Sequence, residues 1–153
     1  MKAMKKGLFL ICLLLSLPGL ASSMNCRVTE MIDHGMWAGF QKKQVDFDSN
    51  LVSFVTAEFG SSLNINLKKI LESHQGTTLI LKSSVASEKI ELVITPLKDS
   101  INNFKIVLTQ LTRRSAVVAH KEMVISSGTP NVARMAIDGN GKQTILECEI
   151  SPI

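Results

Sequence analysis

The sequence predicts an all-β domain, either an antiparallel β-sandwich or a small β-barrel of about eight or nine strands. Apolar and polar residues alternate with period two over most of the chain, which is typical of half-buried strands. Short polar turns separate these segments, and few segments could serve as crossover helices between parallel strands. Cys26 and Cys148 lie near opposite ends of the chain. A disulfide between them is expected to tie the two termini together.

The segment 1–23 is expected to be a cleaved secretory signal, which leaves 24–153 as a single β-rich domain. Three lysines precede an apolar run at 8–17, and small residues follow it. A cut after Ser23 is favoured over a cut after Ala21. Both cuts place small residues at the first and third positions before the cut, as signal peptidase requires. The apolar run is about half as long as a membrane-spanning helix requires.

A chain with this signal is expected to be periplasmic or secreted, and the signal favours a bacterial source. Removing it takes away three of the 17 basic residues and none of the 13 acidic ones, so the net charge falls from +4 to +1. A nearly neutral domain gives no support to nucleic-acid binding. No transmembrane segment is expected in the mature chain.

The two cysteines of the mature chain are expected to form a structural disulfide, because exported proteins meet an oxidising compartment. The bridge would close a loop of 122 residues. The chain-entropy model assigns such a loop about 4–5 kcal/mol of stabilisation. The bridge also requires the two Cα atoms to lie within about 7 Å, so the first and last strands must be neighbours. A redox-active pair would usually have Cys-x-x-Cys spacing, which is absent.

In the first half of the chain, alternation predicts strands joined by polar turns. The segment 29–40 is expected to form a bent strand or a short helix. Two strands, 45–47 and 51–59, flank the turn Asp48-Ser49-Asn50. The segment 62–67 is expected to be a strand that runs into a short helical turn, because Leu67, Ile70 and Leu71 have helical spacing.

In the second half, two hairpins are expected. The first joins 77–82 to 89–97, where Pro96 ends the second strand because it has no N–H for the ladder. The other joins 132–137 to 143–150 around Asp-Gly-Asn-Gly, whose residues readily adopt positive φ. Between them lie strands at 104–109 and 116–125. In the latter strand, alternation places Val117 on the same face as Ala119, Met123 and Ile125.

Residues that could carry chemistry are isolated from one another, so no catalytic, cofactor-binding or metal site is expected. None of the three histidines, His34, His74 and His120, has a second ligand at zinc-site spacing. Glu147 and Glu149 flank Cys148 and are expected to share an exposed face. Arg113 and Arg114 are expected in a strand-to-strand turn, where they could contact an acidic partner.

The triplet Gly35-Met36-Trp37 resembles the Gly-x-Trp signature in the first strand of lipocalins. The resemblance implies an eight-stranded barrel with Trp37 plugging its closed end. Such a barrel would have an apolar cavity that holds a small apolar ligand. Without the resemblance, Trp37 is expected to pack in the core beside a glycine bend.

Together these features predict an exported, non-enzymatic β-domain that binds a protein or another component of the cell envelope. The first alternative is a lipocalin-like barrel that carries a small apolar ligand. The other alternative is a small extracytoplasmic hydrolase or inhibitor, because an active site assembled from dispersed residues leaves no local pattern.

Overall fold

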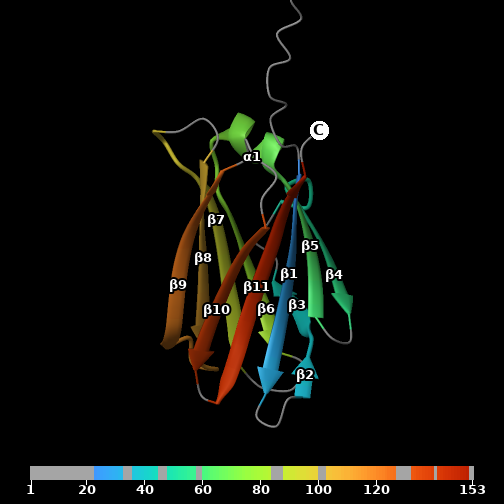
Figure 1. The fold of residues 1–153 in the computed structure, drawn as a ribbon, viewed down its shortest axis with the longest axis vertical. Coiled ribbons are helices and arrows are strands. Elements are labelled where there is room, and N and C mark those ends of the chain that lie inside the picture. Colours follow the sequence, from blue (N-terminus) through green and yellow to red (C-terminus); the bar gives the residue numbers. More distant parts are fainter. Residues whose placement is uncertain are drawn as a thin grey trace, which may run out of the picture.

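The computed structural model describes residues 23–32, 36–44, 48–57, 60–83, 88–99, 103–126, 132–139 and 141–151. The described chain folds into two antiparallel sheets that pack face to face as a β-sandwich (Figure 1). The expected all-β sandwich is therefore confirmed. Residues 1–22 of the expected signal lie outside the described residues.

The first layer is a six-stranded sheet whose two central strands come from opposite ends of the chain. Strand β1 pairs with β11 on one side and with β5 on the other. The order is β10 (Val132–Gly139), β11 (Lys142–Ser151), β1 (Ser23–Ile32), β5 (Gly60–Asn66) and β4 (Val52–Ala57), with β2 (Met36–Ala38) paired to the end of β1.

The second layer is a five-stranded sheet, most of which follows the order of the chain. Its order is β3 (Phe40–Gln44), β6 (Thr77–Ser83), β7 (Lys89–Pro96), β8 (Asn103–Leu111) and β9 (Val117–Ser126). Strand β9 lies beside β10, and β3 lies beside β4. Among the described residues, however, no strand of one sheet pairs with a strand of the other, so the sheets do not close into the barrel that was the alternative prediction.

The described residues form eleven strands rather than eight or nine. The difference arises mainly in the segment 29–40, which was expected to be one bent strand or a short helix. There the chain finishes β1, forms the three-residue strand β2 against it, and then begins β3 in the other sheet. A strand as short as β2 has too few residues to show an alternating pattern.

The inner faces of both sheets form one hydrophobic core. Alternation along most of the strands places every second side chain in this core, as expected for half-buried antiparallel strands. The six-stranded sheet contributes Met24, Val28, Val52, Leu63, Ile65, Met135, Ile137, Leu146 and Ile150; the five-stranded sheet contributes Phe40, Leu79, Leu81, Ile90, Leu92, Ile94, Phe104, Ile106, Leu108 and Ile125.

Helix α1 (Leu67–Ser73) covers one end of the sandwich, at the top of Figure 1. It begins directly after β5, where the Asn66 side chain accepts a hydrogen bond of 3.0 Å from the backbone N–H of Lys69. Leu67 and Ile70 are buried in the core. The helix ends at His74, whose φ of 54° is in the left-handed region. The expected strand followed by a helical turn is confirmed.

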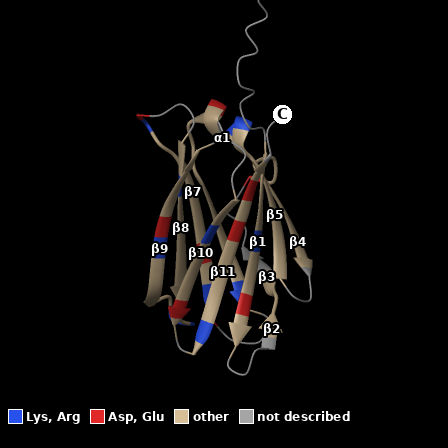
Figure 2. Cartoon of the chain, viewed as in Figure 1, with Lys and Arg blue, Asp and Glu red and all other residues tan. Residues whose placement is uncertain are grey.

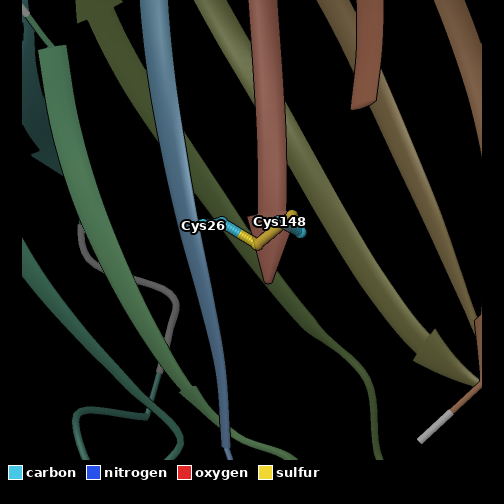
Figure 3. The surroundings of a disulfide bond; sticks show 2 residues. All are labelled: Cys26 and Cys148. Atoms are coloured by element: carbon cyan, nitrogen blue, oxygen red, sulfur yellow. A yellow bond between two sulfur atoms is a disulfide. The ribbon is translucent and has the colours of Figure 1, made fainter. Parts of the chain in front are cut away.

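The disulfide joins Cys26 of β1 to Cys148 of β11, as expected (Figure 3). The two residues are directly opposite in the antiparallel register, with their Cα atoms 4.0 Å apart. Both side chains are buried in the core. Because side chains alternate along a strand, the residues that flank each cysteine face outward. These outward residues are Asn25, Arg27, Glu147 and Glu149.

Both expected hairpins are confirmed, but the face assigned to Val117 is wrong. The hairpins are β6–β7 and β10–β11. In β9, the register against β8 shifts so that Gln110 is opposite Ala119 while Leu111 is opposite Val117. This irregularity separates Val117 from the inner face, and its side chain is exposed.

Candidate functional site

The outer face of the six-stranded sheet carries a row of charged side chains across three neighbouring strands. Glu147 of β11 is opposite Arg27 of β1 on one side and Arg134 of β10 on the other. The Arg134 Nε atom lies 3.3 Å from Glu147 Oε1. Figure 2 shows basic and acidic bands on these neighbouring strands. The register of three antiparallel strands therefore brings together residues that are up to 120 positions apart in sequence.

Trp37 lies at the end of this row, where β2 pairs with β1. The pairing places Trp37 opposite Met31. The indole borders a hollow of about 270 Å³, here named the Trp37 pocket, which is lined by Arg27, Thr29, Trp37, Arg134, Ile145 and Glu147. Thr29 and Ile145 are opposite each other in the β1–β11 register and are almost fully buried. The charged side chains and Trp37 are more exposed, so the pocket combines an apolar face with ionic groups.

A second hollow of about 490 Å³ continues over the same face and shares Arg27 and Glu147 with the Trp37 pocket. It is named here the adjoining hollow. Besides charged groups, its lining includes the polar side chains Asn25, Ser53, Ser62 and Asn64. The amide of Asn64 donates a hydrogen bond of 2.7 Å to Asn25 Oδ1. The two hollows together reach from β4 to β10. At about 4.8 Å per strand this is about 19 Å.

Three of the large apolar side chains that the described residues expose lie on this face or at its margin. Trp37 is 44% exposed, Val55 of β4 is 62% exposed, and Val132 of β10 is 69% exposed. Val55 and Val132 both line the adjoining hollow. Aromatic and arginine side chains dominate the binding energy of many interfaces. This face exposes side chains of both kinds around its two hollows.

A buried polar cluster lies at the end of the sandwich opposite α1. Lys142 Nζ lies 3.1 Å from Glu88 Oε2, and both side chains are mostly buried. Gln110 Nε2 donates to the same Glu88 oxygen at 3.0 Å and to the Gly139 carbonyl at 3.2 Å. Nearby, the Ser83 hydroxyl donates to Glu30 Oε2. These contacts connect the two sheets at the end of the sandwich that α1 does not cover.

Glu30 is the most deeply buried carboxyl of this cluster, with 1% of its surface exposed. Burial raises the pKa of Glu30 above its usual range, and the nearby Glu88 carboxylate raises it further. The Ser83 hydroxyl and the Lys142 ammonium act in the opposite direction, and burial outweighs them. The cluster therefore favours a proton on Glu30 in the folded protein.

The structure separates the residues singled out in the sequence. Trp37 lies on the outer face and is not the core plug that the lipocalin resemblance implies, nor is it packed in the core. Arg113 and Arg114 are exposed in the β8–β9 turn, as expected, and line neither hollow. Glu147 and Glu149 share the outer face, as expected.

The three histidines do not contribute to the site. His74 ends α1, and His120 is exposed on β9. His34 lies outside the described residues.

Arg27 and Arg134 are the site residues that sequence reasoning missed. One signal was available for Arg27, because a residue next to an inward-facing cysteine must face outward. Its position beside Glu147 depends on the β1–β11 register, which no local pattern contains. Arg134 joins the site through the β10–β11 hairpin.

In the described part of the chain, no group of three His, Cys, Asp or Glu side chains is placed to hold a metal ion. The described residues also contain no helix long and apolar enough to cross a membrane. Comparison of the chain with models of known protein families, with curated proteins and with solved structures found no match.

Proposed function

We propose that this protein is an exported, non-enzymatic binding domain. Its binding surface is the outer face of the six-stranded sheet, and its partner is a protein or another component of the cell envelope. The observation that carries the proposal is the grouping of Trp37, Val55 and Val132 around two connected hollows that share Arg27 and Glu147.

One further feature supports export, and the expected cut fits the fold. A cut after Ser23 removes only the first residue of β1 from the domain. The buried disulfide suits a chain that folds in an oxidising compartment. The signal pattern itself remains the main argument for a periplasmic or secreted location.

The experiment compares matched charge substitutions on the two sheets. Val55→Asp and Val132→Asp place a charge on the proposed surface. Val124→Asp places the same charge at a similarly exposed valine (58%) of the five-stranded sheet. The exported proteins are immobilised and challenged with fractionated envelope extract. We expect the first two substitutions to reduce the retained material about tenfold, the effect of losing one good interface contact.

Val124→Asp is expected to leave retention at the wild-type level, and circular dichroism verifies that all three variants fold. Equal retention by the wild type and by the Val55 and Val132 variants would contradict the proposed surface. Retention of nothing by the wild type, together with turnover in a panel of hydrolase substrates, would instead favour the enzyme alternative.

A further inference from the structure

The Trp37 pocket carries an uncompensated positive charge. It contains two arginines and one glutamate, and Arg134 is paired with Glu147. The Arg27 side chain makes no hydrogen bond or ion pair with another described residue, although its strand position is directly opposite Glu147. The described residues that line the pocket thus have a net charge of +1, and the Arg27 guanidinium is available to bind an anionic group. A carboxylate matches the fork of N–H donors on a guanidinium.

The pocket also offers an aromatic surface next to this charge. Trp37 is held by the β1–β2 pairing and remains partly exposed. An exposed indole on a sheet can cover the C–H face of a ring, while its neighbours bond the ring's polar groups. Thr29 and Ile145, both almost fully buried, also line the pocket beside the indole.

Strand addition by a peptide is excluded next to Arg27 and Glu147. That mode of binding needs a free sheet edge. At Arg27, β1 is paired with both β5 and β11, and at Glu147, β11 is paired with both β1 and β10. A ligand on these residues must therefore be recognised through side chains alone, which favours a molecule with many hydroxyl and amide groups of its own.

The adjoining hollow provides complementary groups for such a molecule. Asn25, Asn64, Ser53 and Ser62 supply amides and hydroxyls on the same face. Glu147 and Glu149 also line this hollow, and they would repel a second anionic group placed there. The charge distribution therefore suits a chain with an acidic unit at the Trp37 end and neutral units beyond it.

We propose that the Trp37 pocket binds an acidic saccharide unit, with the sugar ring stacked on Trp37 and its carboxylate paired with Arg27. Neutral sugar units of the same chain extend over the adjoining hollow. This inference rests on the proposed function, since it specifies the envelope component that the outer face of the six-stranded sheet would bind.

The chain supplies its own probe for this site, because Trp37 is the only tryptophan and there is no tyrosine. Tryptophan fluorescence of the exported protein is titrated with a tetrasaccharide that has one glucuronate at its end and three neutral N-acetylglucosamine units. The matched ligand is the same tetrasaccharide with its single carboxyl group reduced to an alcohol. Sodium acetate at equal concentration tests for simple anion binding. We expect saturable change with the acidic tetrasaccharide and much weaker binding of the reduced form and of acetate.

The matched protein variants are Arg27→Gln in the pocket and Arg113→Gln in the β8–β9 turn, each of which removes one positive charge. Arg27→Gln is expected to weaken binding of the acidic tetrasaccharide about tenfold or more, as for loss of one charge-assisted hydrogen bond. Arg113→Gln is expected to bind like the wild type, which separates local recognition from the loss of net charge.

Three outcomes would overturn the inference: no fluorescence change at millimolar tetrasaccharide, equal affinity for the reduced form or acetate, or equal weakening by both arginine substitutions. If any of them occurs while Val55→Asp and Val132→Asp still reduce retention of envelope material as expected, the saccharide assignment fails and the proposed function stands. If those valine variants also retain envelope material normally, the proposed function fails as well.

Discussion

Glu30 illustrates how one residue can link the acidity of the medium to folding. Glu30 is buried near the end of β1, opposite Thr144 of β11. Burying an ionised carboxylate costs free energy, because the charge loses its contact with water. Because the pKa of Glu30 is raised on folding, there is a range of pH above 4.5 in which the folded protein holds a proton that the unfolded chain has released. Stability must therefore depend on pH through this group.

We expect the contribution of Glu30 to the free energy of unfolding to be largest below pH 4.5, the ordinary value, and to fall as pH rises through the raised pKa. Glu30→Gln keeps an acceptor for the Ser83 hydroxyl and removes the titration. The difference in unfolding free energy, variant minus wild type, should grow with pH, by at most about 1.4 kcal/mol per pH unit. Urea unfolding at successive pH values from about 4 upward measures this difference.

Glu149→Gln on the outer face serves as the control for losing one negative charge. If the difference between Glu30→Gln and the wild type stays constant over the pH series, the titration of Glu30 does not contribute to stability.

At the scale of single elements, the sequence predicted strand pairing best for long strands that follow one another directly in the chain. The β6–β7 and β10–β11 hairpins were predicted because period-two alternation and turn residues agree locally. Strand β2 was missed because three residues carry no period. Val117 was placed on the wrong face because the register shift in β9 depends on pairing with β8.

The candidate site was predicted less well than the fold for a related reason. The sequence analysis singled out Trp37 as a barrel plug or core residue, and Glu147 only as an exposed neighbour of Cys148. What makes them neighbours is the pairing of β2, β1, β11 and β10, which joins distant segments. Sequence patterns indicate which way a side chain faces within its strand. They do not indicate which strand lies beside it.

The β1–β11 pair is the element on which we expect stability to depend most. Its disulfide closes a loop of 122 residues. Replacing Cys26 and Cys148 together by alanine is expected to lower the free energy of unfolding by about 2–5 kcal/mol. Urea unfolding followed by far-ultraviolet circular dichroism gives the measurement. Reductant should destabilise the wild type and leave the double variant unchanged, whereas identical midpoints for all samples would show that the bridge contributes nothing.

For the whole molecule, export and oxidation can be tested in one measurement. The full chain is expressed and recovered from the periplasm or medium, and its intact mass is determined before and after reduction. We expect the mass of residues 24–153 less two hydrogen atoms, and a gain of two hydrogen atoms on reduction. A mass that includes residues 1–23 would contradict cleavage. An unchanged mass on reduction would contradict the bridge.

The central position of β1 in its sheet also determines the order in which its two edges can be paired during synthesis. Strand β1 can pair with β5 early in synthesis, but its other edge has no partner until β11, the last strand, has been made. Contacts so distant in sequence make folding slow. During that interval β1 presents an open edge, which other chains can pair with. A chain that crosses a membrane before it folds would benefit from this delay, because β10 and β11 cannot join the six-stranded sheet until they have followed β1 across.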